Sequence, residues 1–160
     1  APENPFPLAV EDVRDAIAWL RSHSQKYRID PENISGWGYS AGANLILLAG
    51  LDPSVGLRAI VSGGTPADLT AWPNSPLVLK FLGVPLNAKP ELWKAASPVN
   101  QVKDKSPPVF LYHGKWDRIV EFEQMKKMEQ ALKEKHRPVE IYEVDFMGHL
   151  AVYFLSQKSV

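Results

Sequence analysis

The 160-residue chain contains no cysteine and carries no net charge, and each absence narrows its class. Without cysteine, a disulfide scaffold, a thiolate metal site and a cysteine nucleophile are all excluded. The 18 acidic and 18 basic side chains balance, so charge gives no reason to expect a nucleic acid or an anionic membrane as partner. No apolar run is long enough to span a bilayer, and residues 1–10 lack the basic segment of a signal peptide. These features do not assign a compartment.

The remaining composition is that of one globular domain with a sizeable core, since hydrophobic residues make up 45% of the chain. Periodicity and turn residues predict helices over 8–27, 43–50, 122–132 and 149–156, with a short helix at 75–82. Strands are expected at 33–38, 57–62, 108–113 and 139–144. Such alternation is typical of the α/β class, and it predicts a mainly parallel sheet of about four strands with helices on both faces. Two glutamates in 139–144 predict a half-exposed edge strand.

The most informative motif is Gly38-Tyr39-Ser40-Ala41-Gly42, which has the form G-x-S-x-G between a predicted strand and a predicted helix. A serine on a sharp strand-to-helix turn exposes its hydroxyl on a strained backbone. The helix behind it directs N–H groups and a positive dipole to where an oxyanion would form. A glycine-rich turn that contains serine by chance is the alternative, and the flanking strand and helix favour a nucleophile.

A serine hydroxyl needs a base at neutral pH, and histidine held by a carboxylate is the usual one. Asp117 follows the third predicted strand and His149 follows the fourth, so both lie at the sheet edge where Ser40 lies. Asp117 as a surface turn residue and His149 as an inert helix start are the alternatives. Asp68 and Asp145 are rival acids.

The other histidines suggest structural or solvated positions. His113 is expected to pack or hydrogen-bond at its strand end, and His23 and His136 lie on predicted helix ends. None of them has a metal-ligand spacing with a second histidine or a carboxylate, so no metal and no cofactor is expected.

Four segments together resemble the α/β-hydrolases of the esterase/lipase type, most closely the acetyl-esterase, feruloyl-esterase-like and kynurenine-formamidase-like group. They are 30–42, 96–98, 108–117 and 147–149, spread over nearly the whole chain. The resemblance implies that Ser40 is the nucleophile, Asp117 the triad acid and His149 the base, with the Ala41 N–H as an oxyanion donor.

The same resemblance implies one domain over 1–160 with a cap-like insertion at about 65–107, a segment rich in Pro, Trp and Leu. One or two of Trp72, Phe81 and Trp93 are then expected to line an acyl or alcohol pocket together with Tyr39. Trp116 is a further candidate for substrate contact.

The chain departs from the family pattern at its beginning, because it has neither the His-Gly-Gly-Gly loop nor the strands that precede the Ser40 strand in the family. The resemblance therefore implies an exposed apolar edge at that strand. A fragment of a longer hydrolase, a minimal form that self-associates at this edge, and a folded chain that does not catalyse all fit this departure. Losing one oxyanion donor costs on the order of 10²–10³ in rate, so slow turnover is expected.

The function predicted first is a serine hydrolase that cleaves carboxylic esters of small acyl groups through an acyl-enzyme. An arylformamidase and a prolyl-oligopeptidase-type peptidase are the enzymatic alternatives. The alternative from another class is a catalytically impaired module used for binding or dimerisation.

Overall fold

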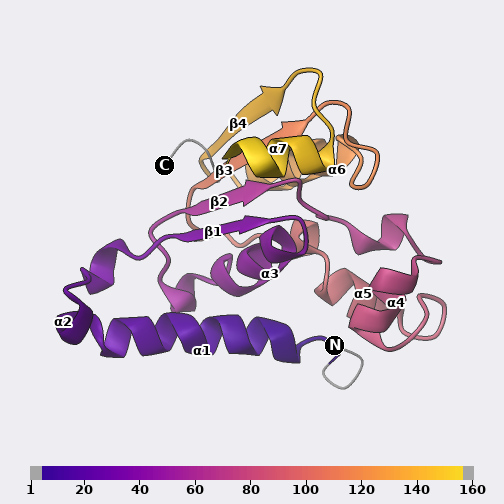
Figure 1. Ribbon diagram of the computed structural model, residues 1–160. Helices are drawn as coiled ribbons and strands as arrows, with labels where there is room; N and C mark the ends of the chain where they lie inside the picture. The colour runs from indigo at the N-terminus through magenta and orange to yellow at the C-terminus, as the bar shows by residue number, and fades with distance from the viewer. Residues whose placement is uncertain (1–4, 157–160) are drawn as a thin grey trace.

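The computed structural model describes residues 5–156, and its centre is a four-stranded parallel sheet in the order β1-β2-β3-β4 (Figure 1). The strands are β1 (Gly36–Tyr39), β2 (Ile60–Gly63), β3 (Val109–Gly114) and β4 (Val139–Val144). All three strand pairs run parallel, so the four carboxyl ends meet at one edge of the sheet. The predicted α/β class and parallel sheet are confirmed.

Helices cover both faces of this sheet, as expected. Helices α3 (Ala41–Gly50) and α6 (Glu123–Glu134) pack on one face, with α1 (Leu8–Ser22) outside α3, whereas α7 (His149–Ser156) lies on the opposite face (Figure 1). Three shorter helices are α2 (Ser24–Tyr27), α4 (Pro76–Leu82) and α5 (Pro90–Ala95).

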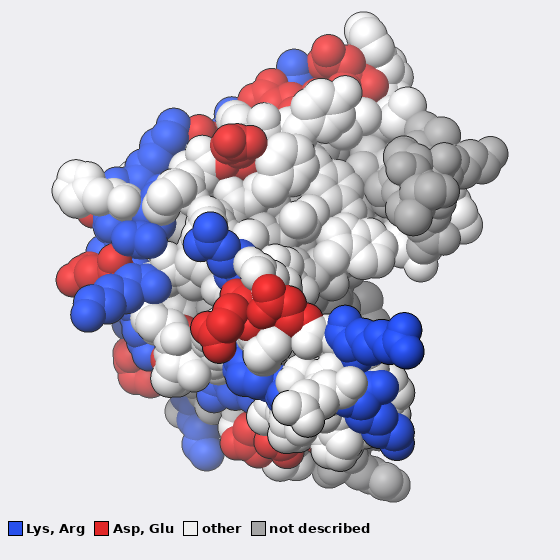
Figure 2. Space-filling view, turned by 90° about the vertical axis from the view of Figure 1, so that its left-hand side faces the viewer, with Lys and Arg blue, Asp and Glu red and all other residues white. Residues whose placement is uncertain are grey.

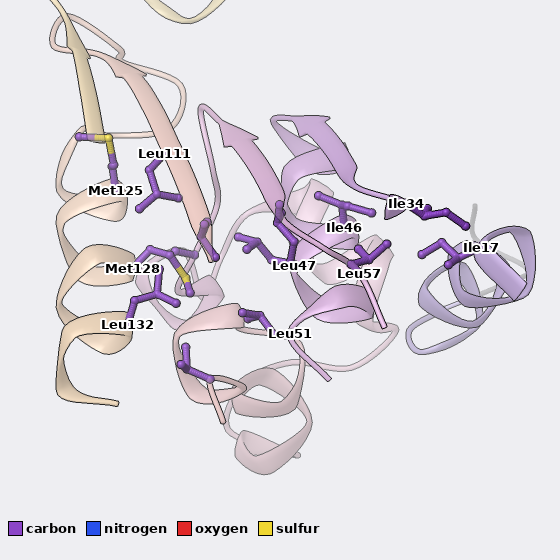
Figure 3. Close-up of a cluster of buried hydrophobic side chains, with 14 residues drawn as sticks. Ile17, Ile34, Ile46, Leu47, Leu51, Leu57, Leu111, Met125, Met128 and Leu132 are labelled. Carbon is purple, nitrogen blue, oxygen red and sulfur yellow. The ribbon is translucent and has the colours of Figure 1, made fainter. Parts of the chain in front are cut away.

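The main core lies between the sheet and the α3/α6 layer. Leu47 from α3 and Leu51 directly after it meet Leu111 from β3 and Met128 and Leu132 from α6, and all five side chains are fully buried (Figure 3). Because these residues come from elements far apart in the sequence, their burial fixes the strand ends relative to one another.

The segment 65–107 builds a second, smaller hydrophobic cluster beside the main core. Its buried members are Leu69, Leu82, Trp93 and Ala96, from α4, α5 and the connections around them. The expected helix at 75–82 is present as α4, which begins at Pro76 under a cap from the Ser75 hydroxyl. Helix α5 was not expected from the sequence, although Pro90 stands in its first turn.

Several predicted boundaries differ from the structure, among them the start of the first strand, which is Gly36 rather than residue 33. The helix expected over 8–27 ends at Ser22, because His23 leaves the helical conformation (φ −106°, ψ 15°) before a single further turn. The second strand begins at Ile60 rather than at residue 57. Leu57 is buried, and the N–H of Arg58 donates to the carbonyl of Ile34, but both residues precede the β1–β2 pairing, which begins at Gly36 and Ile60.

Both outer strands have a free edge within the described residues. Strand β1 pairs only with β2, and its Trp37 side chain is 53% exposed. Strand β4 alternates between half-buried and exposed positions, and its exposed Glu140 agrees with the predicted half-exposed edge.

The surface carries both signs of charge. Figure 2 shows the side of the molecule where the strands begin, and acidic and basic side chains are interspersed there. Within residues 5–156, no helix combines the length and the apolar character needed to cross a membrane.

Candidate active site

Ser40 stands on the turn between β1 and α3 in a conformation that few residues adopt. Its φ is +54° and its ψ is −121°, a region that costs a non-glycine residue about 1–3 kcal/mol. The Ser40 N–H donates to the carbonyl of Gly63 on β2 (2.9 Å), and the Ser40 carbonyl accepts from the N–H of Ala43 (3.0 Å) at the start of α3. Bonds on both sides therefore hold the strained turn.

The glycines of the motif differ in how tightly they are packed. A Cβ on Gly38 would lie 2.3 Å from the carbonyl oxygen of Gly42, so only glycine allows the helix to approach the strand here. A Cβ on Gly42 would meet nothing within 4 Å.

The start of α3 offers a donor beside the serine. Across the described residues, the N–H of Ala41 donates to no protein acceptor, and the Ser40 hydroxyl also forms no hydrogen bond. Since Ala41 is the first residue of the helix, its N–H lies at the positive end of the helix dipole.

Asp117 and His149 are in direct contact. Oδ2 of Asp117 lies 2.5 Å from Nδ1 of His149, and the two residues are only 6% and 7% exposed. Oδ1 of Asp117 accepts from the N–H groups of Ile119 and Val120, both at 2.9 Å. The carboxylate is therefore held at both oxygens, and an ionised Asp117 fixes the proton of neutral His149 on Nδ1, leaving Nε2 as the basic nitrogen.

The surroundings of Asp117 favour its ionised form. Burial raises the pKa of Asp117, but hydrogen bonds from His113, His149 and the N–H groups of Val120 and Ile119 outweigh it and hold the pKa well below its usual range. The carboxylate therefore remains charged at neutral pH.

Tyr39 at the end of β1 and Gly64 directly after β2 contact His149. The Tyr39 hydroxyl donates to the carbonyl of His149 (2.6 Å), and the two rings lie 5.0 Å apart. A Cβ on Gly64 would come within 3.0 Å of Cε1 of His149. Tyr39 directly precedes Ser40, so this contact joins His149 to the end of the strand that carries the serine.

Asp68 and Asp145, the two alternative candidates for the acid, form hydrogen bonds and ion pairs with other residues. Asp68 caps a 3-10 turn through the N–H of Thr70 (3.1 Å) and pairs with Lys127 (2.7 Å). Asp145 is exposed and pairs with Lys115 (2.8 Å).

A cavity of about 510 Å³ opens beside Ser40 between α3, the 65–107 segment and the loop after β3. Its wall is mainly apolar and includes Trp72 and Phe81, two of the aromatic residues expected there. Further lining residues are Ala9, Ala41, Asn44, Leu45, Pro66, Leu69, Ser75, Leu77, Val78, Lys80, Ile119 and Val120. Nothing in the local sequence marked the aliphatic ones, because only the fold brings them together.

The other aromatic candidates lie away from the cavity. The expectation for Trp93 is wrong, since its ring is fully buried in the second cluster and its N–H bonds the carbonyl of Val84 (3.0 Å). Trp116 is 60% exposed, packs edge-on against Phe146 and is not part of the cavity wall. Tyr39 packs against the His149 ring instead of lining the cavity.

Within residues 5–156, no group of three or more His, Asp or Glu side chains is arranged to hold a metal ion. The side chains of His113 and His149 both contact that of Asp117.

The sequence model of the BD-FAE family matches residues 1–132 of this chain. Two relatives come from Mycobacterium tuberculosis. The "Probable carboxylic ester hydrolase LipM" is 29% identical over 93% of this chain and 39% of its own length, and "Esterase LipQ" is 33% identical over 84% of this chain and 36% of its own. This chain thus spans about two fifths of the length of these relatives.

Among solved structures, the acetyl ester-xyloside bifunctional hydrolase from Caldicellulosiruptor lactoaceticus superimposes with a TM-score of 0.83 at 28% identity. The match covers 98% of this chain and 61% of that protein.

Proposed function

This chain belongs to the BD-FAE family and has an α/β-hydrolase fold, and we propose that it hydrolyses carboxylic esters of small acyl groups with Ser40 as the nucleophile. The observation that carries the proposal is the buried Asp117–His149 hydrogen bond beside a strained Ser40. Relatives named as esterases agree with this chemistry.

In the first half of the reaction, Nε2 of His149 takes the proton of the Ser40 hydroxyl as the oxygen attacks the ester carbonyl carbon. The negative charge that develops on the carbonyl oxygen is stabilised by the Ala41 N–H at the helix start. Asp117, which stays ionised, stabilises the imidazolium. When the tetrahedral intermediate collapses, His149 gives its proton to the departing alcohol and the acyl group remains on Ser40.

In the second half, a water molecule gives a proton to His149 and attacks the acyl carbon. Collapse of this second intermediate returns the proton to Ser40 and releases the carboxylic acid. Each proton that His149 accepts is thus passed on, first to the alcohol and then to Ser40, and the enzyme is regenerated with water as the one co-reactant.

The cavity wall supports an ester with an apolar acyl or alcohol group as substrate. Leu69 and Trp72 from the 65–107 segment line it together with α3 residues such as Leu45. We therefore infer that residues 65–107 act as a cap within a single domain, and that the apolar part of the ester lies between this cap and α3.

A fluorophosphonate probe tests the proposal directly, because it labels only a serine that its surroundings activate. We expect the wild-type chain to be labelled and to hydrolyse p-nitrophenyl acetate, and Ser40→Ala to do neither. Ser62→Ala is the matched control, since the Ser62 hydroxyl is buried and bonded to that of Thr65 (2.6 Å).

Absence of both labelling and turnover in the folded wild-type chain would contradict the proposal. That result would favour a hydrolase-fold module used for binding or dimerisation, and native mass spectrometry would then test self-association at the free edge of β1. Hydrolysis of an arylformamide or of a prolyl peptide in preference to the ester would reassign the substrate class while keeping the serine.

A further inference from the structure

Besides His149, a second histidine, His113, brings its imidazole into contact with the carboxylate of Asp117. It lies near the end of β3, is fully buried, and its Nε2 is 2.8 Å from the carbonyl oxygen of Val120 and 3.3 Å from Oδ2 of Asp117. Both neighbours of this nitrogen are acceptors, so Nε2 carries the proton.

The opposite nitrogen of the ring has no partner. Among the described residues, Nδ1 of His113 is the one buried side-chain polar atom without a hydrogen bond. A proton on Nδ1 would be buried without an acceptor and would leave the two oxygens at Nε2 without their donor. The neutral tautomer with Nε2–H is therefore the one that fits the site.

The two imidazoles converge on one oxygen of Asp117. Oδ2 faces both His149 and His113, whereas Oδ1 is held by the N–H groups of Ile119 and Val120. A carboxylate can rotate about its bond to Cβ, and a second donor at Oδ2 adds to the restraint that His149 supplies there. His113 holds the oxygen that orients His149, and through Val120 it also ties down the loop that supplies the other donors.

We propose that His113 is a positioning residue that fixes Oδ2 of Asp117 toward His149 by donating from Nε2. This inference rests on the proposed function for its catalytic consequence, but the arrangement itself can be tested without turnover. A purely structural role would be limited to filling the space under β3 and bonding Val120.

Two substitutions separate these roles. His113→Gln keeps an N–H at the place of Nε2, whereas His113→Leu keeps much of the volume and has no donor. Leu111→Ala is the control for lost stability, because Leu111 is buried on the same strand in the core against α3 and α6.

We expect His113→Leu to lower kcat for p-nitrophenyl acetate about tenfold with KM unchanged, and to shift the low-field proton resonance of the His149 Nδ1–H. His113→Gln should restore both, and Leu111→Ala should lower the melting temperature while leaving both as in the wild type. If His113→Leu loses stability but keeps the wild-type kcat and resonance, the proposal is overturned.

A measurement on the unmodified chain can overturn the proposal even where a variant does not fold. Nitrogen-15 spectra of histidine-labelled wild-type protein should show His113 protonated on Nε2 and unprotonated on Nδ1. A proton on Nδ1 would overturn the proposal. Because this result does not depend on turnover, a chain that fails to hydrolyse esters still tests the position of His113, and the two failures remain distinguishable.

Discussion

The hydroxyl of Tyr39 donates to the backbone carbonyl of His149 at 2.6 Å, so the residue before the serine holds the start of the helix that carries the imidazole. Burial, followed by the charge of Asp117, raises the pKa of Tyr39 above its ordinary value, and the hydroxyl therefore remains a donor. One strand end thus positions both Ser40 and His149.

Removing the Tyr39 hydroxyl should loosen the position of His149 and leave the other contacts of the site in place. Tyr39→Phe keeps the ring against His149 and loses one hydrogen bond, so we expect a loss of about 1 kcal/mol in the free energy of unfolding. If the same amount is added to the activation free energy of the reaction, kcat falls about fivefold. Urea unfolding and ester kinetics measure the two effects. Tyr142→Phe is the control, because that side chain is 60% exposed on β4, and equal kinetics in both variants would refute a positioning role for Tyr39.

The charge of Asp117 should be visible in both rate and stability. In Asp117→Asn, the amide oxygen is needed at the N–H groups of Ile119 and Val120, so the NH₂ group points at Nδ1–H of His149 and forces the wrong tautomer. We expect kcat to fall by about 10³–10⁴. Asp145→Asn, at an exposed ion pair, should keep the wild-type rate.

The same substitution changes how stability depends on pH. Since the folded-state pKa of Asp117 is lowered, its contribution to stability is fully present above about pH 4, the ordinary carboxyl range, and is lost as pH falls toward the folded-state value. Asp117→Asn should therefore be less stable than the wild type at pH 7, and the difference should shrink at pH 3. A constant difference between these pH values in urea unfolding would contradict the ionised, hydrogen-bonded carboxylate.

Local sequence signals located the elements that begin or end at distinctive residues. Strand β4 and helix α7 have the bounds that the sequence predicted, and Asp117 and His149 lie together although 32 residues separate them. The positions of Asp117 and His149 follow from one rule, that the residues after parallel strands lie at a common edge of the sheet. The catalytic roles of Ser40, Asp117 and His149 stay predictions.

Features that depend on tertiary packing could not be predicted in the same way. Trp72 and Trp93 lie in one apolar segment, yet the first lines the cavity and the second is fully buried, because the packing of the whole second cluster decides which ring faces inward. Likewise, the residue type of His113 suggested a hydrogen bond at the strand end, but which nitrogen reaches Asp117 depends on the side-chain geometry.

The close approach at the serine turn predicts opposite effects for the two motif glycines. Gly38→Ala places a methyl group 2.3 Å from the carbonyl of Gly42, and this overpacking should cost at least about 2 kcal/mol in the free energy of unfolding and displace Ser40. Gly42→Ala has open space and a helical position, so its stability should be unchanged or higher by up to about 1 kcal/mol. Thermal unfolding with fluorophosphonate labelling checks both, and equal losses in the two variants would contradict the packing described here.

Trp72 gives the strongest test of where the apolar part of the ester binds. Its ring lines the cavity beside Ser40, and its N–H bonds Glu121 across the loop after β3 (3.1 Å). Burying two further methylene groups is worth about 1.6 kcal/mol, so losing the wall in Trp72→Ala should lower the ratio of kcat/KM for p-nitrophenyl butyrate over acetate about tenfold. Trp72→Phe keeps an apolar wall and should retain most of the ratio, and Trp116→Ala, outside the cavity, should leave it unchanged. If the ratio is the same in Trp72→Ala as in the wild type, the acyl chain does not lie against the cap.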